Sequence, residues 1–151
     1  YRLDLPRTYT KRFAPTPQAA YPRGFAGEPP LLLDRETPVE AAAWLQKHPP
    51  HGRLFNDMVY GSYLTWALYP QTRPYAEPRV ELYGLPFWTE YLRLGHGPPD
   101  AARRLQEQGF SAALLHPESQ KGLIARLQSA PQWTLVRLPG PARLFVLREP
   151  K

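Results

Sequence analysis

The feature that most constrains the fold is an alternation of helical and strand patterns from residue 37 to residue 149. Helical periodicity and short apolar runs between turn signals predict the two kinds of element. The expected helices cover residues 37–48, 61–68, 85–94, 97–109 and 117–130. The expected strands cover residues 52–56, 72–77, 110–116, 133–138 and 142–149. This order indicates an α/β domain with three layers: a mixed, partly parallel sheet of about five strands, helices on both of its faces, and a C-terminal antiparallel strand pair.

Local signals mark several helix ends. Thr37 is expected to cap the first helix, with Pro38 in the first helical position and Glu40 closing a capping box. Ser62 is expected near the N-cap of the second helix. Gly109 is expected just past the end of the fourth helix, where glycine commonly terminates a helix.

Residues 1–36 are set apart from the rest by their prolines and by the lack of any sustained helical or strand period. They predict an extended arm laid on the domain or, equally, a disordered linker. Residues 37–149 are expected to form a single domain, since 151 residues suffice for one core. Because the sequence begins at Tyr1 rather than Met, we expect a fragment of a longer protein.

The charge of the chain argues against a nucleic-acid partner. The formal net charge is +6, but residues 1–33 carry five basic and two acidic side chains and so hold half of this surplus. Nucleic-acid-binding domains show a denser stripe of Lys and Arg, whereas a basic tail also suits a membrane surface. The chain has no cysteine, one methionine and one asparagine, and its many prolines favour a thermophilic source.

No sequence motif predicts a known reaction. There is no G-x-S-x-G, no dinucleotide or phosphate-binding glycine loop and no helical H-x-x-x-H pair. His48 and His51 flank two prolines, so loop histidines are expected there rather than metal ligands. We therefore expect no catalytic residue, no metal and no cofactor in this chain.

The most serious candidates for a binding site are Glu77, Arg79 and Glu81, which alternate along "YAEPRVELYG". If this segment is extended, all three side chains point to one face. They then form either a fixed ion-pair ladder or a polar pocket in which Arg79 holds an anion or a sugar hydroxyl.

A second group follows the strand at residues 52–56. Asn56 and Asp57 are expected to end that strand at the same sheet edge, facing Arg79, where open α/β sheets bind ligands. Tyr63, Trp66 and Tyr83 are expected to frame the place. Rings beside amides and carboxylates suit sugar recognition, but they equally suit a core corner whose polar tips form a structural hydrogen-bond cluster.

Five segments resemble the C-terminal domain of large bacterial multi-pass membrane proteins similar to lipid-phosphosugar-dependent (GT-C-like) glycosyltransferases. They are "PVEAAAWLQKHPPHGRLFNDMVYGSYLTWALYP", "RPYAEPRVELYG", "FWTEYLRL", "LQEQGFSAALLHPES" and "WTLVRLPGPARLFVLRE". The resemblance covers residues 37–149 and is most specific around Asn56, Gly61 and Tyr63. One departure is that Glu77-Pro78-Arg79 replaces the usual Asp-Gly-Arg, and proline cannot adopt the positive φ open to glycine.

The resemblance implies an extracytoplasmic accessory domain. Catalytic acids of such transferases lie in the membrane part, so this chain would be non-catalytic. It would pack on the missing transmembrane domain or help to hold an acceptor or a lipid-linked sugar. An autonomous carbohydrate or small-ligand module remains the alternative, and a hydrolase or transferase using Glu77 and Glu81 is a further one.

Overall fold

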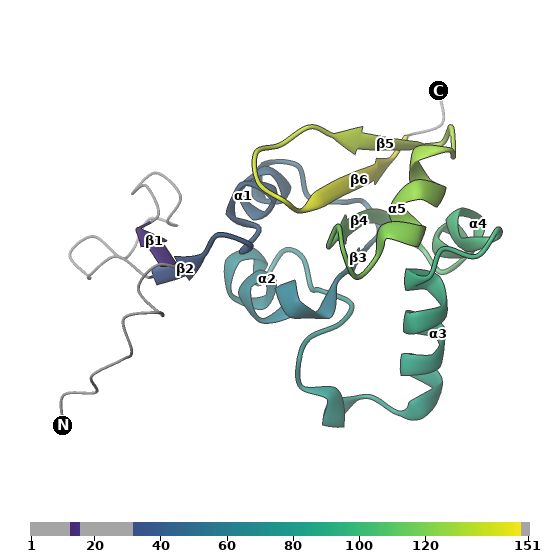
Figure 1. Cartoon of the computed structure of the whole chain (residues 1–151), viewed down its shortest axis with the longest axis horizontal. Coiled ribbons are helices and arrows are strands. Elements are labelled where there is room, and N and C mark those ends of the chain that lie inside the picture. The colour runs from purple at the N-terminus through teal and green to yellow at the C-terminus, as the bar shows by residue number, and fades with distance from the viewer. Residues whose placement is uncertain (1–12, 16–31, 149–151) are drawn as a thin grey trace.

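The computed structural model describes residues 13–15 and 32–148, and residues 32–147 contain an α/β domain (Figure 1). Its helices are α1 (Val39–Lys47), α2 (Gly61–Leu68), α3 (Leu85–Gly95), α4 (Ala101–Glu107) and α5 (Lys121–Gln128). Its main strands are β3 (Arg53–Asn56), β4 (Phe110–Leu115), β5 (Trp133–Val136) and β6 (Arg143–Leu147). Short 3₁₀ turns cover η2 (Met58–Tyr60) and η3 (Val80–Leu82).

The four strands form an open mixed sheet in the order β3-β4-β6-β5. Strand β3 pairs parallel to β4, while β6 pairs antiparallel to both β4 and β5. The mixed sheet and the antiparallel pair at the C-terminal end agree with the sequence prediction. The parallel pair matters for function because its two carboxyl ends meet at one edge of the sheet.

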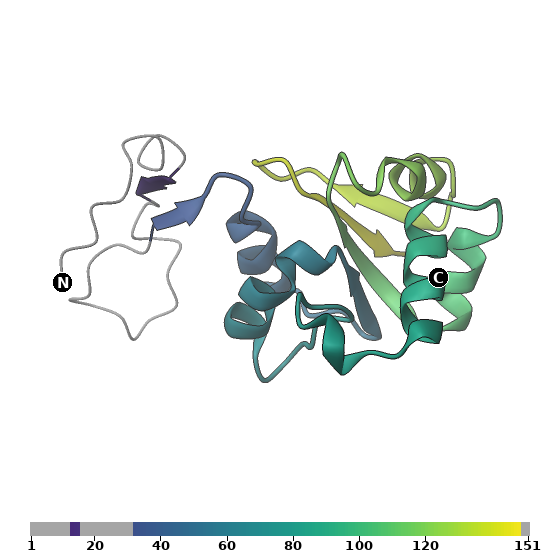
Figure 2. The same ribbon diagram turned by 60° about the horizontal axis from the view of Figure 1, so that its bottom comes forward.

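Two hydrophobic cores contact opposite faces of this sheet, because successive strand residues point to opposite sides. Leu54, Leu114 and Leu144 pack with α1 and α2, whereas Phe55 and Leu115 pack with α3, α4 and α5. Figure 2 shows the blue helices on one side of the sheet and the green helices on the other.

The strand predicted at residues 72–77 is wrong. Within the described chain this segment makes a single bridge, between Pro74 and Leu54 of β3. A proline has no N–H to donate to a strand ladder, so pairing at this edge stops at one contact.

Two predicted helix caps are also wrong. Helix α1 begins at Val39 after Pro38, and no side chain caps it. Helix α2 begins at Gly61 after Tyr60, so Ser62 lies inside its first turn. Gly109 does follow α4 with a positive φ of 79°, as expected.

Part of the predicted N-terminal arm falls outside the described residues. Residues 1–12 and 16–31 are not described, so the contacts expected of the arm cannot be followed there. The backbone of β1 (Phe13–Pro15) pairs antiparallel with that of β2 (Leu32–Asp34).

Candidate functional site

A cleft of about 600 Å³ lies at the carboxyl ends of the two parallel strands, β3 and β4. Three segments and one residue before α1 line it: the turn after β3, the turn after β4, one side of α3, and Glu36. We call it the carboxyl-end cleft, and its lining residues are Glu36, Asp57, Met58, Val59, Tyr91, Leu92, Gly95, His96, His116, Glu118, Ser119 and Gln120. Its place in the fold is where open α/β sheets hold ligands.

Asp57 is the most firmly held acid of this cleft. Its Oδ1 accepts a hydrogen bond from the backbone N–H of Val59 at 3.0 Å and so caps η2. Its Oδ2 accepts from the Ser119 hydroxyl at 2.5 Å, which joins the turn after β3 to the turn after β4. The carboxylate is therefore fixed in one orientation, with lone pairs left for further donors.

Tyr91 brings a phenol from α3 to the same place. Its hydroxyl oxygen accepts from the backbone N–H of Met58 at 2.8 Å and from the Gln120 amide at 3.4 Å. Burial raises the pKa of Tyr91, and the charge of Asp57 raises it further. The phenol thus stays neutral and keeps one proton to donate.

His116 follows β4 directly and is oriented by its own turn. Its Nδ1 accepts from the backbone N–H groups of Glu118 at 3.2 Å and Ser119 at 3.4 Å. The proton of the neutral ring therefore sits on Nε2, which faces the Glu36 carboxylate at 3.7 Å.

The charge of the lining restricts what the cleft can bind. Three carboxylates (Glu36, Asp57 and Glu118) line it together with two histidines, and neither Lys nor Arg is among the described residues of the lining. Phosphate or another anion would meet a negative field here. Hydroxyl groups, by contrast, can donate to carboxylates and accept from the phenol of Tyr91.

A smaller hollow of about 180 Å³ adjoins this cleft and shares Glu36 and Val59 with it. Tyr60 lines the hollow, and its ring centroid lies 5.8 Å from that of His116. The Tyr60 hydroxyl is buried and has no hydrogen-bond partner among the described residues. Burial, with the nearby charges of Asp57 and Glu36, raises the pKa of Tyr60, so this hydroxyl is neutral.

Asn56, although predicted beside Asp57, is turned away from the cleft. Its Nδ2 donates to the carbonyls of Ala76 at 2.7 Å and Asp57 at 2.8 Å. Its Oδ1 accepts from the backbone N–H groups of Tyr75 at 2.7 Å and Ala76 at 3.2 Å. Of the two sequence interpretations, the structural hydrogen-bond cluster is the one that Asn56 forms.

The predicted row of Glu77, Arg79 and Glu81 does not lie on one extended face, because residues 80–82 form η3. Arg79 donates to the carboxylate of Glu77, and the two make an ion pair. That hydrogen bond raises the pKa of Arg79, with the charge of Glu81 adding a smaller contribution. None of the three lines the carboxyl-end cleft.

The three predicted framing aromatics separate into two groups. Tyr63 and Trp66 contact each other on α2, with ring centroids 5.8 Å apart. Tyr83 instead stacks on Phe87 of α3, at 4.3 Å. Together they do not frame a single place.

The sequence prediction missed Tyr91, His116 and Ser119. A signal for His116 was present, since it ends the strand expected at residues 110–116 and the carboxyl ends of parallel strands meet at one edge. Tyr91 has no such signal in the sequence, because an aromatic residue within an amphipathic helix is usually part of the core.

No family model, curated protein or solved structure matches the chain. Across the described residues, no helix combines the length and the apolar character needed to cross a membrane. The same residues contain no group of three or more His, Cys, Asp or Glu side chains placed to hold a metal ion.

Proposed function

We propose that this chain is a non-catalytic, extracytoplasmic accessory domain of a multi-pass membrane glycosyltransferase-like protein of bacterial origin. In this role it packs on a transmembrane domain and helps to hold the sugar of an acceptor or of a lipid-linked donor. The resemblance of residues 37–149 supplies this context. The three-layer description of the domain belongs to the same proposal and is supported by the two cores on opposite faces of the sheet.

One observation carries the ligand-binding part of the proposal. The carboxyl-end cleft presents fixed hydrogen-bonding groups, and its lining has no Lys or Arg in the part of the chain that the structure describes. Asp57 and Tyr91 each accept a hydrogen bond from a backbone N–H group. Their side chains are therefore already ordered, and little of their conformational entropy is lost when a hydroxyl binds between them. Val59 and Leu92 add exposed apolar surface that suits the C–H face of a sugar ring.

The test is a titration of this chain with neutral sugars, in which binding is monitored through the amide chemical shifts in NMR spectra. Methyl glucoside, methyl mannoside and N-acetylglucosamine serve as probes, and glucose 1-phosphate serves as the charged counterpart. We expect a neutral sugar to shift the amides of residues 57–59, 91–96 and 116–120. Glucose 1-phosphate is expected to bind more weakly, because its charge meets three carboxylates.

Asp57→Asn is the informative variant, since the amide oxygen still caps η2 while the charge is lost. We expect it to weaken sugar binding by about tenfold, as for a lost hydrogen bond to a charged group. Glu107→Gln, an exposed carboxylate on α4, is the matched control and should bind like the wild type. Unchanged cleft amides with every neutral sugar would contradict the proposal.

An autonomous carbohydrate or small-ligand module is the second candidate, and the same cleft favours it. The two candidates differ in the need for a membrane part. Tight binding by this chain alone supports the module, whereas weak binding that strengthens in the longer protein supports the accessory domain. A hydrolase acting through Glu77 and Glu81 has less support, because Glu77 is engaged by Arg79.

A further inference from the structure

The carboxyl-end cleft contains a carboxylate that is buried without a counter-charge. Asp57 is only 4% exposed, and it forms no ion pair with any described Lys, Arg or His side chain. Its two hydrogen bonds come from uncharged donors, the backbone N–H of Val59 and the hydroxyl of Ser119. A buried carboxylate is costly unless a cation neutralises it. The described part of the chain supplies no such cation.

Glu118 adds a second carboxylate to the lining of the same cleft. It is exposed, and among the described residues its side chain forms no ion pair either. Glu118 lies in the turn after β4, which the hydrogen bond from Ser119 to Asp57 joins to the turn after β3. Two unneutralised carboxylates in one cleft produce a field that attracts cations.

Tyr91 gives an independent indication that this cleft takes a ligand with hydroxyl groups. The residue is only 5% exposed, and its hydroxyl oxygen already accepts hydrogen bonds from Met58 and Gln120. Both lone pairs of the oxygen are thus used, while no described group accepts the phenol proton. A buried donor without an acceptor is costly. A ligand hydroxyl in the cleft supplies the acceptor.

The hydrogen bonds of Asp57 favour an ammonium group over a guanidinium group as the cation. Its two carboxylate oxygens already accept bonds from two different segments. A guanidinium group binds best as a fork that uses both oxygens of one carboxylate at once. An ammonium group is a compact charge with three donors, so single N–H groups can reach Asp57 and Glu118 separately.

We propose that the carboxyl-end cleft prefers an amino sugar whose protonated primary amine lies between Asp57 and Glu118. The ammonium group donates to both carboxylates, and a ring hydroxyl accepts the proton of Tyr91. The C–H face of the ring covers Val59 and Leu92, which are 59% and 55% exposed. This inference rests on the proposed function, because it names the class of sugar that the same cleft holds.

The test compares amino sugars with their acetylated forms, in which the ring is kept and the charge is lost. The probes are methyl 2-amino-2-deoxyglucoside and methyl 6-amino-6-deoxyglucoside, each beside its N-acetyl derivative, titrated into the whole chain and followed by NMR. At low salt we expect at least one amine to bind about tenfold tighter than its N-acetyl derivative. Added salt should reduce this preference, because it screens the attraction between the charges.

Variants assign the preference to the two carboxylates. Asp57→Asn should reduce the preference for the amine from about tenfold to about twofold. Glu118→Gln should reduce it by less, since an exposed carboxylate is better screened by water. Glu107→Gln removes an exposed carboxylate outside the cleft and should keep the full preference. Far-UV circular dichroism confirms that each variant is folded.

The outcomes separate this inference from the proposed function. If the sugars bind but neither amine is preferred, the inference fails while the proposed function stands. If no form of either sugar shifts the amides of the cleft, both fail. The inference is also overturned if Asp57→Asn keeps the full preference. Ethylamine, an amine without a sugar ring, should bind at least about tenfold more weakly than the preferred amino sugar, and equal binding would show that the cleft recognises charge alone.

Discussion

Gly61, the first residue of α2, has no side chain, and this allows a segment far away in the sequence to pass close to the helix. Its φ of −56° is an ordinary helical value, so the glycine is not needed to make a turn. A Cβ at this position would overlap the carbonyl oxygen of Ala76 and crowd Glu77. The missing side chain instead allows residues 76 and 77 to pass directly over the start of the helix.

We expect Gly61→Ala to lower the free energy of unfolding by about 2 kcal/mol, because two backbone segments must separate to admit the methyl group. The measurement is urea denaturation. Gly95→Ala is the matched control, since the nearest atoms to its Cβ are those of the Gln120 side chain at 3.8 Å. That change should be neutral or stabilise by about 0.5 kcal/mol through helix propensity. Equal effects of the two substitutions would refute the packing role of Gly61.

Asn56 illustrates what a sequence can indicate about a single residue and what it cannot. Its position after an apolar strand predicts a polar group at the sheet edge, and the structure places it there. Whether it faces a ligand or the protein depends on residues 75 and 76, which return to β3 from about 20 positions away. No local pattern encodes that return, so the sequence alone allows both interpretations, and the hydrogen bonds to Tyr75 and Ala76 distinguish them.

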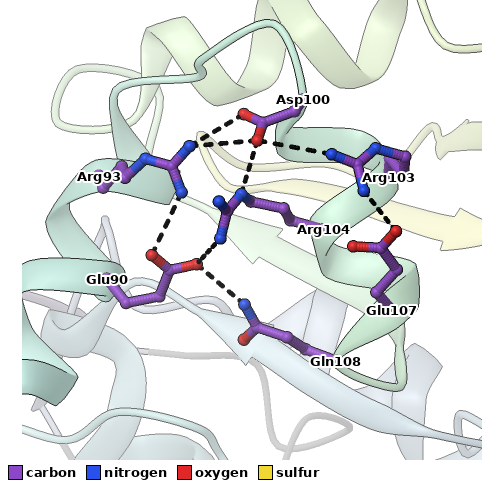
Figure 3. A network of polar contacts seen from close by, with 7 residues as sticks. All are labelled: Glu90, Arg93, Asp100, Arg103, Arg104, Glu107 and Gln108. Atoms are coloured by element: carbon purple, nitrogen blue, oxygen red, sulfur yellow. Dashed lines mark hydrogen bonds and ion pairs between the residues drawn. The ribbon is translucent and has the colours of Figure 1, made fainter.

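At the scale of elements, helices α3 and α4 are joined by a network of charged side chains (Figure 3). Asp100 is its centre: its Oδ2 accepts from Nε of Arg104 at 2.6 Å, and Arg93 donates to both of its oxygens. Arg104 also reaches Glu90 at 3.2 Å, so the network spans both helices. The hydrogen bond from Arg104, followed by that from Arg93, holds the pKa of Asp100 below its ordinary value of 3.8.

This lowered pKa predicts a specific acid response. The folded state holds the charged form of Asp100 more strongly than the unfolded chain does, so its contribution is present above the ordinary pKa and is lost as the pH falls through the lowered value. Asp100→Asn should therefore reduce the loss of stability on acidification below about pH 4. Urea midpoints measured across that range test this, with Gln106→Ala on the same helix as control. The prediction would be contradicted if the urea midpoints of Asp100→Asn and of the wild type fell by the same amount as the pH was lowered.

The elements that the sequence predicted well are those whose signals are local. Helices α3, α4 and α5 have clear apolar periods, and Gly109 marks the end of α4 where expected. The segment at residues 72–77 failed because its composition suits a strand, whereas strand formation requires a partner with matching N–H groups. Pro74 occupies the position that faces Leu54, and a strand there could not continue the ladder.

At the scale of the whole molecule, the short strand β3 separates two surfaces of opposite character. Arg53 at its start lines a hollow together with Arg73, and Asp57 just past its end lines the carboxyl-end cleft. Four steps along an extended chain cover only about 13 Å.

The sheet also makes the two cores a single folding unit. Leu114 and Leu115 are neighbours on β4 and are both fully buried, yet Leu114 packs with α1 and α2 and Leu115 with α3 to α5. Loss of either side chain destabilises the same central strand, so both cores should lose stability. We expect Leu114→Ala and Leu115→Ala each to lower the free energy of unfolding by about 3 kcal/mol.

Single-tryptophan versions of the chain that retain Trp133 or Trp44 report on the two faces separately, because Trp133 belongs to one core and Trp44 packs against the other. In each leucine variant the two fluorescence transitions should coincide with each other and with the loss of far-UV circular dichroism. If Leu114→Ala shifted only the transition seen by Trp44, the cores would be independent. Coincidence would instead mean that β4 transmits the loss from one face to the other, as its place between β3 and β6 requires.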